Sequence, residues 1–236
     1  MKAIVIGASS GMGHEVAQRM VKRGWTVAAA ARRKEMLEDI GAALTAEIDV
    51  NADDAPEKLN ALIEKLGGID LYFHAAGIGK QNPDLQTGIE LSTVSTNCLG
   101  FTRIIDAVFN YMASHGGGRI VCISSIAGTK GLGPAPSYSA SKAFQNTYIE
   151  ALQQLANSRK LGIRFTDLRP GFVDTPLLSG THHYPMLMQT EPVVDEIMKA
   201  IDSGKAVRVI DWRWRIVTAL WRRIPHWIWR KMKLTK

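Results

Sequence analysis

The sequence predicts a doubly wound α/β domain, built on a parallel sheet of about seven strands with helices on both faces. Short apolar runs alternate with segments of helical periodicity, which is typical of strand–helix–strand crossovers. A glycine-rich turn joins the first strand to the first helix, and polar residues follow several later strands. The 236 residues suffice for one domain with a substantial core. The expected strands are 2–6, 25–31, 43–48, 69–74, 119–124, 163–168 and 206–210.

The first strand runs into a turn with three glycines that opens a helix. Glycines let the backbone approach a pyrophosphate closely, and the free amides at a helix start favour that anion. A plain glycine turn is the alternative, but strand, turn and helix in this order favour a dinucleotide site. The residues of this turn are Gly7, Ser9, Ser10, Gly11, Met12 and Gly13.

The second and third strands end in residues suited to the rest of a dinucleotide. The second strand ends in Arg32 and Arg33 rather than in an acid. An acid would bind a ribose 2′-hydroxyl, whereas arginines pair with a 2′-phosphate, so NADP(H) is favoured over NAD(H). The alternative is that both arginines are solvated at the start of a helix. The third strand ends at Asp49 and Val50, where a side chain can meet an adenine edge.

A helix is expected over residues 53–66, and the fourth strand then ends in His74. We expect a packed or hydrogen-bonded histidine rather than a metal ligand, because no second His or Cys lies at metal spacing. No metal site is therefore predicted. The small residues after it leave room for a cofactor ring; they are Ala75, Ala76 and Gly77.

The next two helices and the fifth strand carry the residues that suggest catalysis. A helix over 92–115 contains Asn97, whose amide is either structural or part of a proton relay. Ser125 follows the fifth strand, and Tyr138 and Lys142 lie one turn apart on one face of a helix that ends near residue 161.

Together, a phenol, an amine and a hydroxyl can exchange a proton with a substrate oxygen. A phenol titrates near ~10, and we expect Lys142 to lower the pKa of Tyr138 by favouring the phenolate. Ser125 would hold a carbonyl or alcohol oxygen beside the phenol. The alternative is a surface tyrosine with a solvated lysine. Further along, residues 177–191 are expected to form a lid or a loop with His182 and His183 facing solvent, followed by a helix over 192–203.

The net charge of +7 is concentrated at the C-terminal end. Residues 205–236 hold ten Lys or Arg and one acid, and residues 211–236 hold five of the six tryptophans. A helix is expected near residues 214–224, with Thr218 opposite its apolar arc; Pro225 would break it or open a second helix. The expected arc consists of Trp214, Ile216, Val217, Leu220, Trp221 and Ile224.

A basic, tryptophan-rich tail suits the headgroup layer of an anionic membrane. Packing against the body or a subunit interface is the alternative, and nucleic acid ranks last because the rest of the chain offers no basic surface. A membrane-facing tail suggests an apolar or lipid-linked carbonyl substrate. The two cysteines suggest no disulfide framework, and no apolar run reaches ~18 residues. We therefore expect a cytoplasmic protein, peripheral at the inner face of the membrane if the tail binds lipid.

With these motifs in view, residues 1–210 resemble the short-chain dehydrogenases/reductases, whose catalytic domain is a Rossmann-type fold. The resemblance implies cofactor contacts from the glycine turn, from the residues after strands two to four, and from both Tyr138 and Lys142. It also implies a homo-oligomer, dimer or tetramer, through the helices that start near Ser92 and Ser137. The implied tetrad is Asn97, Ser125, Tyr138 and Lys142, and the implied nicotinamide segment includes Pro170, Gly171, Val173 and Thr175.

This chain departs from the family pattern at two strands. The family usually has threonine at Ile6 and asparagines at His74 and Ala75, so the usual brace between strands one and four is altered. The sequence thus predicts a catalytic domain over 1–210, a tail over 211–236, and an NADP(H)-dependent oxidoreductase that interconverts a ketone or aldehyde with an alcohol. The rival is a non-catalytic NADP(H)-binding sensor or membrane-tethered scaffold.

Overall fold

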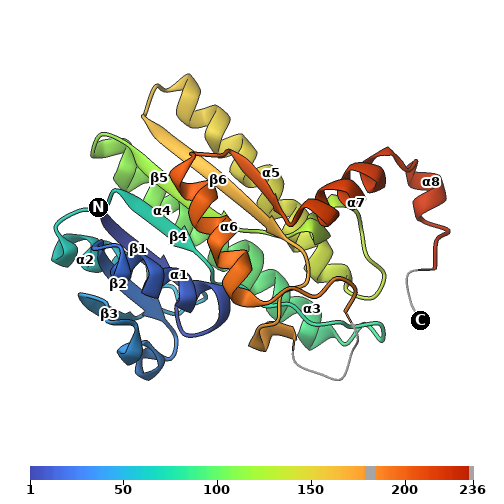
Figure 1. Ribbon diagram of the computed structural model, residues 1–236, viewed down its shortest axis with the longest axis horizontal. Coiled ribbons are helices and arrows are strands. Elements are labelled where there is room, and N and C mark those ends of the chain that lie inside the picture. Colours follow the sequence, from blue (N-terminus) through green and yellow to red (C-terminus); the bar gives the residue numbers. More distant parts are fainter. Residues whose placement is uncertain (179–183, 234–236) are drawn as a thin grey trace.

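Seven parallel strands form one sheet in the order β3-β2-β1-β4-β5-β6-β7 (Figure 1). The computed structural model describes residues 1–178 and 184–233. The doubly wound fold is therefore confirmed, and each expected strand is present with small shifts at its ends. The strands are β1 (Lys2–Ile6), β2 (Thr26–Ala31), β3 (Leu44–Glu47), β4 (Leu71–His74), β5 (Gly118–Ile123), β6 (Ile163–Pro170) and β7 (Val207–Ile210).

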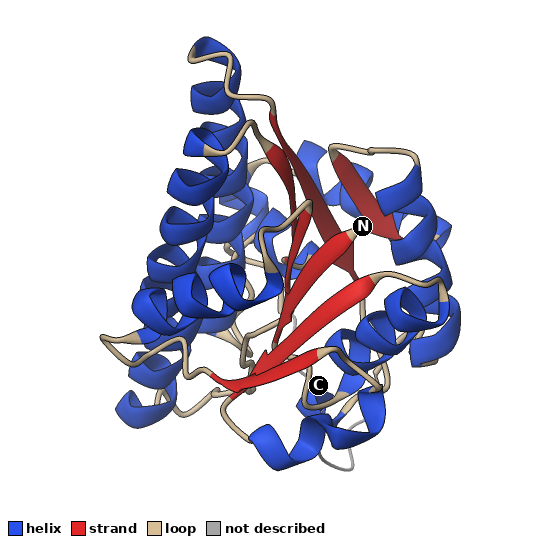
Figure 2. Cartoon of the chain, turned by 90° about the vertical axis from the view of Figure 1, so that its left-hand side faces the viewer, coloured by secondary structure: helices blue, strands red, loops and turns tan. Residues whose placement is uncertain are grey.

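Helices cover both faces of the sheet, and each face has its own apolar core (Figure 2). Alternate residues of β1 point to opposite faces: Ala3 and Val5 join one core, Ile4 and Ile6 the other. The first core lies under α1 (Gly11–Lys22) and α6 (Thr190–Asp202). The second lies under α2 (Ala55–Leu66), α4 (Phe101–Ser114) and α5 (Pro136–Ser158).

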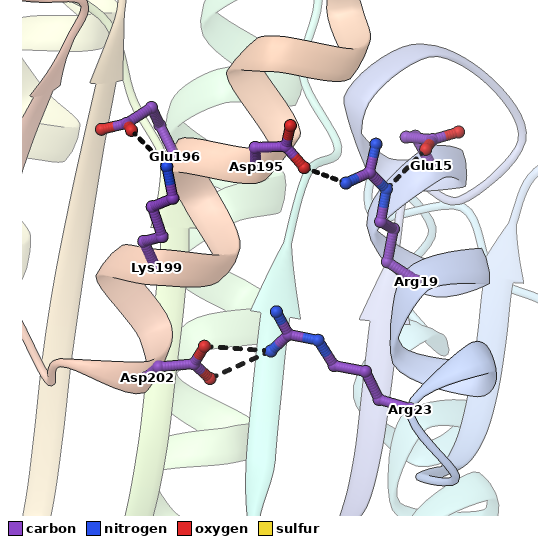
Figure 3. A network of polar contacts seen from close by, with 7 residues as sticks. All are labelled: Glu15, Arg19, Arg23, Asp195, Glu196, Lys199 and Asp202. Atoms are coloured by element: carbon purple, nitrogen blue, oxygen red, sulfur yellow. Dashed lines mark hydrogen bonds and ion pairs between the residues drawn. The ribbon is translucent and has the colours of Figure 1, made fainter.

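Ion pairs along the outer sides of α1 and α6 join these two helices (Figure 3). Arg19 contacts both Glu15 and Asp195, and Arg23 Nη1 lies 3.1 Å from Asp202. Such exposed pairs contribute about 0–1 kcal/mol each, so apolar burial is the main contribution that holds α6 beside α1.

The helix expected over 92–115 begins earlier and is interrupted. It consists of α3 (Thr87–Val94), a π-helical turn over Ser95–Gly100, and α4. A 3₁₀ helix that the sequence analysis did not expect covers Lys34–Ile40. The π turn holds Asn97, and such turns occur often at functional sites.

The tail forms two helices that extend from the edge of the domain, α7 (Trp212–Arg223) and α8 (His226–Trp229) (Figure 1). The expected apolar arc is wrong in part. Thr218, placed opposite the arc, is buried with its hydroxyl donating to the Trp214 carbonyl, whereas Ile216 and Leu220 are exposed. The helix is rolled so that Trp214 reaches the core, and this places the neighbouring threonine inside.

Residues 177–191 are described in two parts. A 3₁₀ turn covers Pro176–Leu178, and Met188 is buried and forms a β-bridge with Val173. His182 and His183 lie outside the described residues. Among the helices described within 1–178 and 184–233, none has the length and apolar character needed to cross a membrane.

Candidate active site

A cleft of about 270 Å³ lies at the carboxyl ends of the strands, where the strand order reverses between β1 and β4. Ligands of doubly wound sheets bind at such switch points. A wider hollow of about 780 Å³ between α2 and α4 contains none of the predicted site residues. The predicted residues that line the cleft are Gly7, Ser9, Ser10, Gly11, Met12, Gly13, Arg32, Arg33, Asp49, Val50, Ala75, Ala76, Gly77 and Thr175.

The glycine turn is packed against the end of β4 so closely that side chains do not fit. A Cβ on Gly7 would lie 2.4 Å from the Ala76 nitrogen, and its φ of +86° also favours glycine. A Cβ on Gly13 would lie 2.3 Å from the Gly7 carbonyl oxygen. The glycine turn and the first residues of α1 therefore line the cleft with close-packed backbone, and backbone amides at a helix start are the groups that bind a pyrophosphate.

The far side of the cleft is formed by the ends of β2 and β3. Arg32 and Arg33 are exposed there. Asp49 accepts a hydrogen bond from the Asn51 amide at 3.0 Å, and Asn51 donates to Thr96 Oγ1 at 3.0 Å. Asn51 and Thr96, which the sequence analysis missed, thus join this side of the cleft to the π turn.

Asn97 is fully buried in the π turn and holds the loop that follows β4. Its Oδ1 accepts from the Ile78 amide at 2.9 Å, and its Nδ2 donates to the Ile78 carbonyl at 2.7 Å and to Ser141 Oγ at 3.0 Å. Every amide atom therefore has a partner. The side chain of Asn97 therefore holds the loop, and the backbone carbonyl of Asn97 accepts a hydrogen bond from a different residue.

Gln145, a residue that the sequence analysis missed, joins Lys142 to the backbone carbonyl of Asn97. Lys142 Nζ donates to Gln145 Oε1 at 2.9 Å, and Gln145 Nε2 donates to the Asn97 carbonyl at 3.0 Å. Lys142 Nζ also donates to the Ile123 carbonyl at 3.2 Å. Gln145 was detectable as a polar residue three positions after Lys142, on the same helix face as the tetrad lysine.

Tyr138 lies beside Lys142, but its pKa does not follow the expectation. Lys142 Nζ lies 5.8 Å from the centre of the Tyr138 ring, and burial lowers the pKa of Lys142 to about 8. Burial raises the pKa of Tyr138, while a hydrogen bond with Ser125 opposes the rise. The prediction that Lys142 lowers the pKa of the phenol is therefore wrong for the protein alone, because desolvation outweighs any effect of the ammonium.

Ser125 caps the 3₁₀ turn Ile126–Thr129 at the end of β5. Its Oγ accepts from the Ala127 amide at 3.1 Å and donates to the Pro170 carbonyl at 3.4 Å. The structure thus brings Asn97, Ser125, Tyr138 and Lys142 into one connected group. A substrate oxygen placed against Ser125 would also meet the Tyr138 phenol.

The segment after β6 is only partly at the cleft. Thr175 lines it, whereas Val173 is buried in the core. Gly171 faces the tail instead, because a Cβ there would lie 2.1 Å from Trp214 Nε1. Of the four residues predicted in this segment, only Thr175 borders the cleft directly.

His74 occupies the place of the usual brace between strands one and four. It is fully buried, its Nδ1 lies 2.8 Å from the Tyr72 hydroxyl, and its ring meets Phe101 edge-on. Burial and the charge of Lys142 lower the pKa of His74 to about 3, so it is neutral at pH 7. Its partner in the sheet, Ile6, is apolar, so packing replaces the brace here.

The short chain dehydrogenase family model matches residues 1–184, which include all four tetrad positions. The chain belongs to the short-chain dehydrogenase family. An uncharacterised oxidoreductase from Myxococcus xanthus is 35% identical over 237 residues, covering 95% of this chain and 92% of that protein.

Solved structures of other short-chain dehydrogenases share the fold. One from Burkholderia cenocepacia, in complex with NADP, superposes with a TM-score of 0.85 at 23% identity, covering 100% of this chain and 98% of that chain. A single-residue variant of actinorhodin polyketide ketoreductase with NADPH has a TM-score of 0.76 at 27% identity, covering 89% of this chain and 95% of that chain. These structures share the fold, and the family match and the Myxococcus xanthus relative make this chain an oxidoreductase of this family.

The buried ammonium predicts a pH-dependent stability. Because the pKa of Lys142 falls from 10.5 to about 8 on folding, its charge destabilises the fold below pH 8, and this cost disappears as pH rises toward 10.5. Relative to Lys142→Met, the unmodified protein should gain about 2–3 kcal/mol of unfolding free energy between pH 7 and pH 10. Urea titrations at both pH values measure it, with exposed Lys22→Met as control; parallel curves would contradict the prediction.

The close approach of Gly79 to the Tyr138 ring predicts that a side chain at position 79 lowers turnover. A Cβ on Gly79 would lie 2.5 Å from Tyr138 Cε2, so in Gly79→Ala either the ring or the loop must shift, and we expect the phenol to move relative to Ser125. A displacement of this kind costs up to about 10²-fold in turnover. We expect kcat to fall at least tenfold with little change in thermal stability, while Gly88→Ala, which meets no atom within 4 Å, leaves both unchanged. Equal kcat values for the two variants would show that the ring position is unimportant.

Proposed function

We propose that this protein is an NADP(H)-dependent oxidoreductase that interconverts a ketone or aldehyde with an alcohol. The observation that carries the proposal is the contact between Tyr138 and Ser125 beside the buried ammonium of Lys142. This group adjoins the cleft through two residues that line it: Ile123, whose carbonyl accepts from Lys142, and Gly77, where a Cβ would lie 3.7 Å from Lys142 Nζ. A protein that only bound the nucleotide would gain nothing from that arrangement.

The residues that line the cleft suit a nicotinamide dinucleotide. The amides of the glycine turn would hold the pyrophosphate, and Arg32 and Arg33 would pair with a 2′-phosphate. Asp49 and Val50 would border the adenine, and Lys142 the nicotinamide ribose. Neighbours of the same fold solved with NADP and NADPH support this preference over NAD(H). Ala75, Ala76 and Gly77 would lie behind the ribose, and Thr175, the residue after β6 that borders the cleft, would lie at the nicotinamide.

The chain's own residues would manage the proton. Because burial raises the pKa of Tyr138, the phenol is protonated at pH 7 and can give its proton to a carbonyl oxygen held by Ser125. The nearby Lys142 ammonium then stabilises the phenolate that remains. Gln145 and Asn97 hold that ammonium in place behind the phenol. The bound nicotinamide supplies or accepts the hydride.

An apolar carbonyl compound is the proposed substrate class. The segment after β6, whose Thr175 borders the cleft, carries an aromatic cluster: the Phe172 ring lies 4.8 Å from Tyr184 and 5.7 Å from Trp214, centre to centre. An aromatic cluster beside the cleft favours substrates that bury apolar surface. A lipid-linked ketone or aldehyde would satisfy it, and the likeness to a polyketide ketoreductase supports a carbonyl group as the reacting centre.

A cytoplasmic homo-oligomer, dimer or tetramer, is the proposed state of the protein. Apolar side chains are exposed on α3, the π turn and α5, where the resemblance places subunit contacts. Examples are Leu91, Leu99 and Phe144, exposed by 64%, 62% and 38%. Burying them between subunits would remove them from water.

Removing the phenol should separate an enzyme from a nucleotide-binding sensor or scaffold. Tyr138→Phe should lower kcat for NADPH-dependent ketone reduction by about 10²–10⁴-fold, because the proton donor is lost. The dissociation constant for NADPH, measured by fluorescence titration, should change little. A panel from small diketones to long-chain ketones, with NADH in parallel, supplies the assay. Retained turnover in Tyr138→Phe would refute the proposed chemistry.

The two arginines predict the choice of nucleotide. Arg32→Ala with Arg33→Ala should weaken NADPH binding by about tenfold to hundredfold, because charge-assisted hydrogen bonds to a phosphate are lost. NADH binding should change less than about threefold, since NADH has no 2′-phosphate. Calorimetric titration with both nucleotides measures this. A similar loss for both would assign the arginines a structural role.

A further inference from the structure

The outward face of α7 carries a stripe of apolar side chains that nothing in the described chain covers. Trp212, Ile216 and Leu220 follow one another at four-residue spacing, so they share one side of the helix. Their exposed fractions are 61%, 53% and 57%. These three residues are the outer stripe, and α8 adds the exposed Trp227, at 65%.

The opposite side of the tail is already occupied by the body. Trp214 and Trp229 are buried, and a row of edge-to-face rings runs from Trp214 through Trp221 to Trp229. Trp229 Nε1 donates to the Gly131 carbonyl at 2.7 Å, and Lys130 Nζ donates to the Ile224 carbonyl at 3.0 Å. The inner side of the tail therefore packs against the body. This packing does not explain why the outer stripe is apolar.

The charges around the outer stripe are almost all positive. The one acid of the tail, Asp211, is paired with Arg213 at 2.8 Å. The exposed cations have no ion-pair partner among residues 1–178 and 184–233, and Lys231 instead lies 5.9 Å above the Trp227 ring. These exposed cations are Arg215, Arg222, Arg223, Arg230, Lys231 and Lys233.

We propose that the outer stripe and these cations dock the protein on an anionic phospholipid bilayer. Tryptophan and aliphatic side chains enter the headgroup layer, while arginine and lysine pair with anionic lipids. A symmetric contact with a second copy would instead place the same cations against one another. A nucleic acid would leave the apolar stripe without a partner. Charge and apolarity together therefore fit a bilayer surface.

Docking at this surface would bring the substrate side of the domain to the lipid. Lys130 and Gly131, which hold the tail, lie in the loop between Ser125 and Tyr138. An apolar carbonyl compound dissolved in the bilayer would then reach the cleft with little exposure to water. The docking itself does not rest on the proposed chemistry, so vesicle binding and turnover are measured separately.

The test is co-sedimentation of the full chain with sucrose-loaded vesicles. Vesicles of phosphatidylcholine with about 40% phosphatidylglycerol should pellet the protein, and pure phosphatidylcholine should pellet much less. Raising salt to about 0.5 M should weaken binding, because exposed charges are screened. Ile216→Ser with Leu220→Ser, and separately Arg222→Glu with Arg223→Glu, should each weaken partitioning about tenfold or more.

Matched variants control for the loss of apolar surface and of charge elsewhere. Leu85→Ser with Val207→Ser removes apolar side chains exposed by 61% and 49%, and Lys22→Glu with Arg164→Glu reverses two exposed cations. Both should bind vesicles like the unmodified chain. Equal binding to both vesicle types, or full binding by the stripe variant, overturns the proposal. So does a stripe variant whose mass by light scattering falls to that of a smaller oligomer, which would make the stripe a self-interface.

Discussion

The site depends on one buried cation. Lys142 is only 5% exposed, and its ammonium is held by a backbone carbonyl and an amide oxygen rather than by a carboxylate. The carbonyl belongs to the end of β5, and the amide is anchored on the π turn through the Asn97 carbonyl. A buried charge with neutral partners tolerates little movement, because any lost hydrogen bond leaves it poorly solvated. The end of β5, the helix α5 and the π turn must therefore keep their positions relative to one another.

The sequence was sufficient to predict the fold, and it singled out four residues that the structure brings together, because both depend on local patterns; the catalytic roles of these residues stay a prediction. Strand, glycine turn and helix follow one another within β1 and α1, and Tyr138 and Lys142 are spaced by one helical turn. Gln145 could be noticed as a polar residue on the helix face of Lys142, but its role could not be assigned, since that role depends on meeting the Asn97 backbone carbonyl, 48 residues away in the chain. The pKa of Tyr138 also escaped prediction, because it depends on how completely the surrounding loops exclude water.

The tail illustrates a different limit of sequence reasoning. Helical periodicity identified an apolar arc, but a helix with tryptophan on two sides has two apolar faces, and periodicity does not say which one meets the body. The close approach of Trp214 to Gly171 decides the orientation, since only a residue without a side chain leaves room for the indole. The sequence left two alternatives for the whole tail, packing against the body and a surface that faces the membrane. In the structure one side of the tail packs against the body, and the opposite side is exposed.

The two hydrogen bonds between the tail and the loop at Lys130 and Gly131 have a mechanical consequence. Both use backbone carbonyls as acceptors, one in each segment, so the two segments are linked in both directions without involving the sheet. A displacement of α8 would therefore also displace the loop that leads into α5, the helix that carries Tyr138.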